Sequence, residues 1–403
     1  MKNSSFNNRE RKLITGISLI MGIRMLGVSM IFPVFSIFAT GLPNSTATLA
    51  GLAVGIFGIV QVLVQVPIGR LSDAWGRKQV TLLGLGVYFI GSILSGLSKS
   101  IHHLIFARLL SGAGAINGVT MAWLADGVSD GKRNSALSFV GISMGLAVIV
   151  GFTLSPIVAA KIGIPYLFYI CAAIILVTIF YTARYLERGE GFIDGTLDIK
   201  KEGLLQLMKN GDLLRLNLIG FVGNISLASV FFIMPLLFHQ EIGMSHLWKL
   251  YIPVALMGTA SMFCFGKLAD LHGTVPVTAT GLALELAGIA VMILFPGIVA
   301  SIASFVLFYT GHCILSPVLP AAVSRYPNAR LKGTVMSIFN SFQFLGSGIG
   351  GLASGIITEY DHRYIFVVLA VLVAAALMSL MGYGNFSRNV RRPGACGSPD
   401  SAS

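Results

Sequence analysis

The length of the uncharged apolar runs constrains this chain more than any other feature. Residues 49–68 and 79–97 each contain no Asp, Glu, Lys or Arg. A helix of about 20 apolar residues crosses the hydrocarbon core of a bilayer. Charged residues make up only 11% of the chain, against about a quarter in soluble domains. The alternation of a transmembrane barrel is absent, so we expect a polytopic helical membrane protein.

The chain is expected to cross the membrane twelve times, in two six-helix halves. The two halves cover residues 1–184 and 215–385, and residues 185–214 join them. The predicted spans are 13–38, 47–70, 79–98, 101–124, 134–160, 164–184, 215–238, 248–268, 275–298, 301–324, 331–357 and 363–384.

The basic residues are distributed unequally between the two sides of the membrane. Most of the 28 Lys and Arg fall in segments on the side of the N-terminus, and the opposite loops hold only Lys99, Lys161, Lys249 and Arg363. By the positive-inside rule, both termini are predicted to be cytoplasmic, in a plasma (inner) membrane. The net charge of +12 is therefore a topology signal, and we expect no nucleic-acid partner.

Two polar segments are expected on the cytoplasmic side. Within the linker 185–214, a cluster of apolar residues with lysines on either side indicates a helix lying on the lipid surface. The apolar residues are Leu204, Leu205, Leu207 and Met208, and the lysines are Lys200, Lys201 and Lys209. A partner-binding helix is the alternative. Residues 386–403 lack apolar periodicity and are predicted to be a disordered tail.

The two halves repeat one another in sequence. "GRLSDAWG" at residues 69–76 resembles "GKLADLHG" at 266–273, and "RNSALSFVG" at 133–141 resembles "KGTVMSIFN" at 332–340. Duplicated halves of this kind typically flank a binding site near the membrane midplane.

These features resemble the major facilitator superfamily. Its signature loop between spans 2 and 3 fits Gly69-x-Leu71-x-Asp73-x-x-Gly76-Arg77-Lys78, and its proton-coupled span-4 signature fits Leu104-x-x-x-Arg108-x-x-Ser111-Gly112-Ala113-Gly114-Ala115. The antiporter signature of span 5 is partly met, with Ser155 where a Gly usually precedes Pro156. With "RMLGVSMIFPVF" in span 1, the chain resembles the YajR-like branch of the drug:proton antiporters.

The resemblance implies a gating network of Asp73, Arg77, Asp126 and Arg133. Span 11 begins on the cytoplasmic side, so its N-terminus presents free N–H groups that a carboxylate at Asp73 could engage. Such a latch is worth about 0.3–2 kcal/mol. Gly69 is expected to let helix backbones approach and Gly76 to permit the reversal.

The second half has a weaker version of the same loop. It keeps Gly266, Asp270 and Gly273 but has Thr274-Val275 in place of Arg77-Lys78. We therefore expect Asp270 to face the start of span 5 and to form a weaker latch.

A few polar residues inside the spans are candidates for substrate or proton binding. Arg24 lies about 17 Å into span 1, where a charge should face a cavity or a partner. The resemblance assigns Arg108 to proton coupling. Glu285 in span 9 and His312 in span 10 are alternative proton carriers, and Glu285 could instead stabilise packing. Asn117 and Asn224 could contact substrate or join helices.

Three function classes follow. The first is a proton-driven exporter of small amphipathic compounds working by alternating access, and the second is a carrier for an anionic or sugar-like metabolite. A membrane sensor or scaffold is the non-transport alternative. We expect no enzyme, metal or cofactor, because no nucleophile–base pair or ligand cluster is present in the sequence. The expected partners are substrate, protons and lipids, and the protein is expected to be a monomer.

Overall fold

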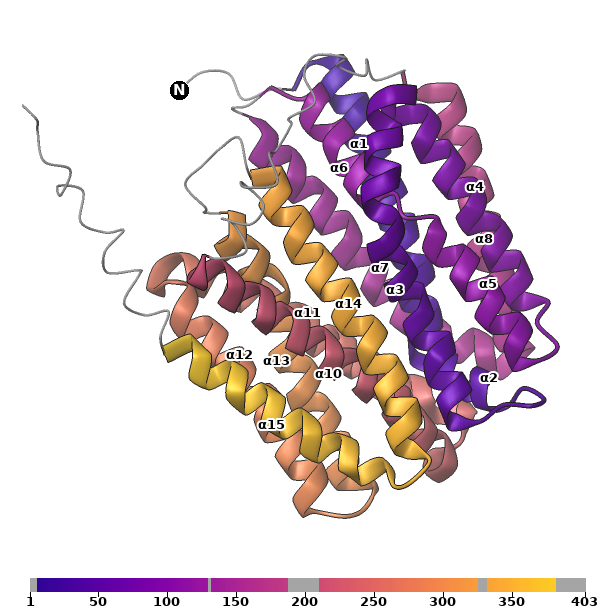
Figure 1. Cartoon of the computed structure of the whole chain (residues 1–403), viewed down its shortest axis with the longest axis vertical. Helices are drawn as coiled ribbons and strands as arrows, with labels where there is room; N and C mark the ends of the chain where they lie inside the picture. The colour runs from indigo at the N-terminus through magenta and orange to yellow at the C-terminus, as the bar shows by residue number, and fades with distance from the viewer. Residues whose placement is uncertain (1–5, 130–131, 188–209, 325–331, 382–403) are drawn as a thin grey trace, which may run out of the picture.

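The computed structural model describes residues 6–129, 132–187, 210–324 and 332–381. Within these ranges every regular element is helical, which confirms the predicted fold class (Figure 1). Most of the predicted surface helix of the linker, and the whole predicted tail 386–403, lie outside the described residues.

The N-terminal half contains six helical passes, two of them interrupted. The elements are α1 (Asn8–Ile31), η1 (Phe32–Val34), α2 (Phe35–Thr40), α3 (Ala47–Trp75), α4 (Arg77–Gly96), α5 (Ile101–Ala113), α6 (Asn117–Gly127), α7 (Arg133–Ile162) and α8 (Ile164–Tyr185). Local capping fixes several starts. The Thr46 and Ser100 side chains accept hydrogen bonds from the backbone N–H groups of Leu49 and His103 at the N-termini of α3 and α5.

The C-terminal half contains six further passes in the described ranges. The elements are α10 (Gly211–Ile242), η3 (Met244–His246), α11 (Leu247–His272), α12 (Thr274–Leu294), α13 (Ile298–Ser324), α14 (Lys332–Thr358) and α15 (His362–Met381). Eleven passes of the described chain are long and apolar enough to cross a membrane. The helix α14 falls outside this set, because glycines and polar side chains dilute its hydropathy.

Span 4 is broken where we predicted one continuous helix over 101–124. It ends as α5 at Ala113 and restarts as α6 at Asn117. The break follows close packing: a Cβ on Gly112 would lie 2.7 Å from the Phe57 carbonyl oxygen, and one on Gly114 would lie 2.6 Å from that of Gly84. The glycine-rich signature therefore lets α5 press against both α3 and α4.

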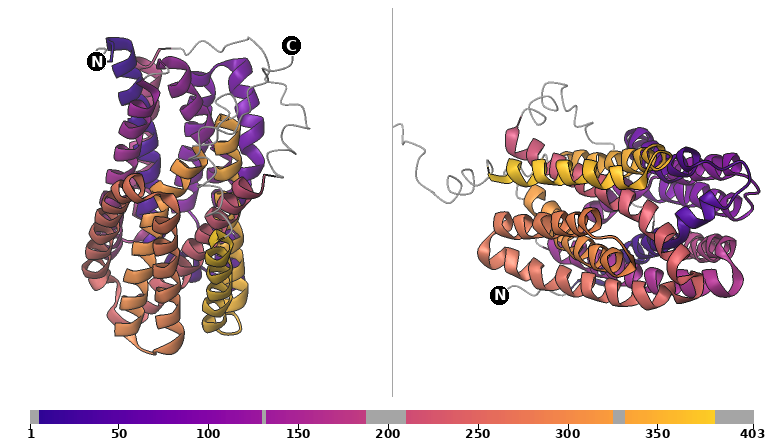
Figure 2. Two further views of the ribbon diagram at one scale, coloured as in Figure 1. Left: turned by 90° about the vertical axis from the view of Figure 1, so that its left-hand side faces the viewer. Right: turned by 90° about the horizontal axis from the view of Figure 1, so that it is seen from below.

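The sequence repeat is also a backbone repeat. Gly76 between α3 and α4 has φ 96° and ψ 147°, and Gly273 between α11 and α12 has φ 94° and ψ 163°. Both lie in a region that side chains other than glycine rarely adopt, which explains why both loops keep this residue. Seen from below, the indigo-to-magenta and the salmon-to-yellow helices form two neighbouring groups (Figure 2).

The helix α14 joins the two halves along α3 (Figure 1). A Cβ on Gly51 of α3 would lie 2.5 Å from the Gly351 carbonyl oxygen, and one on Gly58 would lie 2.6 Å from that of Phe344. A second set of glycines, Gly346 and Gly350, packs against α10 in the same half. Close helix contacts are therefore present on two faces of α14.

Candidate functional site

A cavity of about 320 Å³ lies between the two halves. Both halves supply its walls, which consist mainly of Phe, Met and aliphatic side chains. Its polar lining includes the predicted residues Arg24, Arg108, Asn117, Asn224 and His312, together with Gln61. Sequence reasoning thus found five polar residues of the cavity, including both arginines, without knowing that they share one space.

The two intramembrane arginines lie on the N-terminal half of the cavity wall. Arg24 is 5% exposed, and its guanidinium carbon lies 5.8 Å from the centre of the Tyr88 ring. The guanidinium of Arg108 lies between two rings, 4.4 Å from the centre of Phe57 and 5.0 Å from that of Phe35. Aromatic faces attract cations but do not neutralise them.

On the C-terminal half, Glu285 and His312 form a buried pair. The Oε1 atom of Glu285 lies 3.1 Å from Nδ1 of His312, and the Glu285 side chain is fully buried between α12 and α13. Its second carboxyl oxygen, Oε2, makes no hydrogen bond within the described chain. His312 borders the cavity, so it lies between Glu285 and the interior space. The two were predicted as alternatives, and the structure places them in contact.

The two predicted asparagines reach the cavity from different halves. Asn117 begins α6, and Asn224 on α10 donates from Nδ2 to the Gly220 carbonyl at 3.0 Å. Gln61 on α3 is 2% exposed, and its Oε1 atom accepts no hydrogen bond from the described residues. These amides can supply both donors and acceptors to a bound molecule.

One end of the cavity is sealed by contacts between the halves. The Phe231 ring of α10 lies 4.8 Å from that of Phe32 and 5.4 Å from that of Phe152, both in the N-terminal half. The Tyr251 hydroxyl donates to the Pro33 carbonyl at 3.3 Å. The glycine contacts between α3 and α14 lie at this same end, which we call the sealed end.

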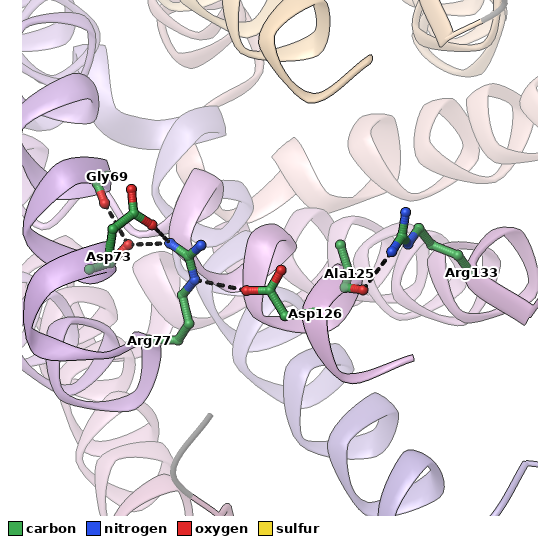
Figure 3. Close-up of polar contacts among 7 residues, drawn as sticks. Gly69, Asp73, Arg77, Ala125, Asp126 and Arg133 are labelled. Atoms are coloured by element: carbon green, nitrogen blue, oxygen red, sulfur yellow. Dashed lines mark hydrogen bonds and ion pairs between the residues drawn. The ribbon is translucent and has the colours of Figure 1, made fainter. Parts of the chain in front are cut away.

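The opposite end, which carries the loop between α3 and α4, holds the predicted charge network. The Nη1 atom of Arg77 lies 2.6 Å from Asp73 Oδ1, and its Nε atom lies 3.0 Å from Asp126 Oδ2 (Figure 3). Arg133 donates from Nη2 to the Ala125 carbonyl at 2.8 Å, one residue before Asp126. The structure thus joins Asp73 and Asp126 through Arg77, whereas Arg133 binds a backbone carbonyl beside Asp126.

Gly69 differs from its prediction. No described atom lies within 4 Å of a Cβ built on Gly69, so the expected close helix approach is wrong for this conformation. The same is true of Gly266 on α11, its counterpart in the repeat, and of Gly141 and Gly145 on α7. Gly69, Gly266 and Gly141 lie toward the loop ends of their helices, and Gly145 lines the cavity.

The predicted Asp73 latch is not engaged in this conformation. The carboxylate of Asp73 is bound to Arg77, its side chain is 59% exposed, and the glycine contacts of α14 with α3 lie at the sealed end. Asp270 is exposed near the C-terminus of α11.

Several polar contacts escaped the sequence reasoning, among them two that involve Glu359 and Lys78. Glu359, just after α14, accepts through Oε1 a hydrogen bond from the backbone N–H of Thr48 at 3.1 Å, joining the halves at the sealed end. Lys78 donates from Nζ to the Ala183 carbonyl at 2.8 Å, near the C-terminus of α8. Neither has a local sequence signal, because the partners are far apart in the chain.

Comparison with known proteins identifies this architecture. The family model described as Major Facilitator Superfamily matches residues 17–351 and 254–395. The chain belongs to the major facilitator superfamily. Among its superfamily relatives, the inner membrane transport protein YajR of Escherichia coli (strain K12) is 30% identical over 381 residues, covering 91% of this chain and 82% of that protein. This multi-pass membrane protein is thus a transporter of that superfamily.

More distant relatives agree with this assignment. Multidrug resistance protein 1 of Bacillus subtilis (strain 168) is 23% identical over 381 residues, covering 91% of this chain and 96% of that protein. Among solved structures of the superfamily fold, a bacterial homologue of the human lysosomal transporter Spinster superposes with a TM-score of 0.74 at 14% identity, covering 94% of this chain and 98% of that one.

Proposed function

We propose that this transporter moves small amphipathic compounds by alternating access and couples their movement to protons. The observation that carries the proposal is the cavity between the halves, sealed at one end by contacts that can separate. Its apolar walls suit molecules with a hydrophobic body, and its polar groups are few, as in other small-molecule sites. The direction consistent with the antiporter resemblance is export.

The sidedness follows from charge. The bias of lysines and arginines toward the loop end supports a cytoplasmic location for that end and for both termini. In this conformation the cavity would then be closed toward the outside, with the halves apart at the cytoplasmic side. The Asp73 latch would form in the opposite conformation, when the start of α14 approaches α3.

The Glu285–His312 pair is our candidate for the proton site. With one shared proton the pair is neutral overall, whichever atom holds that proton. A second proton makes it positive, and loss of the shared proton leaves a buried negative charge. Each change of protonation therefore alters the charge of the cavity wall, which can couple a proton to the conformational equilibrium.

Proteoliposomes test this function directly. Vesicles with an imposed pH gradient and an entrapped pH dye are exposed to a panel of amphipathic cations, organic anions and sugars. We expect one class to trigger proton flux. Glu285→Gln and His312→Asn should lower that flux by roughly tenfold or more while substrate exchange persists.

Matched controls are available on exposed helix ends. Glu241→Gln and His272→Asn remove the same groups away from the cavity and should leave the flux unchanged. Unchanged flux in Glu285→Gln would refute the assigned proton site. Absence of flux with every compound would favour the scaffold alternative.

A carrier for an anionic metabolite is the second candidate. The observation favouring it is the presence of Arg24 and Arg108 on the cavity wall.

A further inference from the structure

The cavity wall carries uncompensated positive charge. Arg24 and Arg108 both line it, and no Asp or Glu is among the described residues that do. The Nη1 and Nη2 atoms of Arg24 and the Nε atom of Arg108 make no hydrogen bond within the described chain. Arg24 is more than nine-tenths buried, so these donors are enclosed at the wall of the cavity.

The neighbouring groups do not offset this charge. Tyr88, under the guanidinium of Arg24, also has an unsatisfied hydroxyl, and a phenol is neutral at ordinary pH. The buried Glu285 lies behind His312 in the opposite half, outside the cavity lining, and is already paired with it. An unpaired charge at membrane depth is costly, so these two guanidinium groups would stabilise a bound anion.

We propose that the cavity binds amphipathic organic anions, with the anionic group held by Arg24 and Arg108. This inference rests on the proposed transport function and names its substrate class. Guanidinium groups bind carboxylate, sulfonate or phosphate oxygens through charge-assisted hydrogen bonds.

The remainder of the cavity defines the rest of the ligand. Its Phe and Met side chains would cover an apolar body, and a volume of about 320 Å³ lies at the small end of the range for drug-sized ligands. Gln61, which also lines the cavity, adds an unsatisfied acceptor for a polar group elsewhere on the ligand. A cationic ligand would meet two like charges and no carboxylate on this wall.

Cys313 offers a direct readout, because it lines the same cavity next to His312. In a Cys264→Ser, Cys396→Ser background, Cys171 stays buried and Cys313 is the thiol to follow. The rate of Cys313 alkylation by N-ethylmaleimide is measured in nanodiscs by mass spectrometry. The probes are 2-naphthoate and 2-naphthylmethylammonium, which differ mainly in the sign of their charge.

We expect naphthoate to slow alkylation and the ammonium probe to have no such effect. Arg24→Gln and Arg108→Gln should raise the naphthoate concentration needed for protection by about tenfold or more. Arg24→Lys, which keeps the charge, should retain part of the protection. Arg184→Gln, on an exposed face of α8 outside the cavity, is the matched control and should behave as the parent does.

The inference is overturned if the ammonium protects as well as naphthoate, if naphthoate gives no protection, or if neither glutamine variant weakens it. Should the variants not fold, the comparison of the two probes on the parent protein decides alone. Protection by naphthoate without any proton flux would uphold the anion site and contradict proton coupling. Proton flux driven only by cations would uphold proton coupling and contradict the anion site.

Discussion

The Oε1 atom of Glu285 on α12 lies 3.1 Å from the Nδ1 atom of His312 on α13, with the carboxyl group fully buried. Removing one partner of such a pair leaves the other without compensation, at a cost of about 3–5 kcal/mol. We expect Glu285→Ala and His312→Ala each to lower stability strongly and the double variant to cost less than their sum. The free energy of unfolding in detergent is measured for the parent, the two single variants and the double variant. A double-variant cost equal to the sum of the two single costs would contradict the coupling.

The sealed end should open when a side chain is added to the α3–α14 contact. A Cβ at position 51 would meet the Gly351 carbonyl at 2.5 Å, so Gly51→Leu should shift the equilibrium away from this conformation. Spin labels at the exposed residues His103 and Tyr360 would report a longer distance across the sealed end. Gly86→Leu, a position with open space around it, is the control and should leave the distance unchanged.

The contact between Glu359 and Thr48 should respond to pH. The hydrogen bond from the Thr48 backbone lowers the pKa of Glu359 in the sealed conformation. The stabilisation that this hydrogen bond gives the sealed conformation is therefore complete above the ordinary carboxyl pKa. It is lost as the pH falls through the lowered pKa of Glu359. The same labels should show opening of the sealed end on acidification into that range. If Glu359→Gln shows the same pH response as the parent, this assignment is wrong.

Asp73 should matter most in the conformation that the structure does not show. Asp73→Asn keeps the size of the side chain but removes the charge that would engage the start of α14, a contact worth about 0.3–2 kcal/mol. Labels at Ala74 and His272, at the loop ends of α3 and α11, should shift toward longer distances. An unchanged distance distribution would refute the latch.

Arg77 should stabilise the loop end in both conformations. It is the common partner of Asp73 and Asp126, and its side chain is only 16% exposed. We expect Arg77→Ala to lower the melting temperature more than Asp73→Asn does, because it breaks both ion pairs at once. Thermal unfolding of the two variants side by side tests this order.

The sequence could predict what depends on local pattern. Span lengths, the Gly76 reversal and the clustering of Asp73, Arg77 and Asp126 follow from apolar runs and a short motif. The pairing of Glu285 with His312 was out of reach, because it depends on the rotation of α12 against α13, which no spacing encodes. Arg24 and Arg108 were found individually, but their shared cavity needed the tertiary structure.

Gly69 illustrates a different limit. Its motif serves a transport cycle that passes through several conformations, and the structure shows one of them. A glycine that packs against nothing here can still be required where the halves meet at the loop end.

The two glycine faces of α14 imply that mutations affecting folding and mutations affecting the transport cycle fall at different positions. Gly346 and Gly350 lie against α10 within one half, so larger residues there damage the integrity of that half and reduce the amount of protein made. Gly348 and Gly351 face α3 across the boundary between halves, so larger residues there spare the fold and alter the turnover rate. Substitutions on this one helix would thus fall into two classes, those that lower the amount of protein and those that lower the transport rate. Second-site mutations that restore the transport rate would map to the N-terminal half.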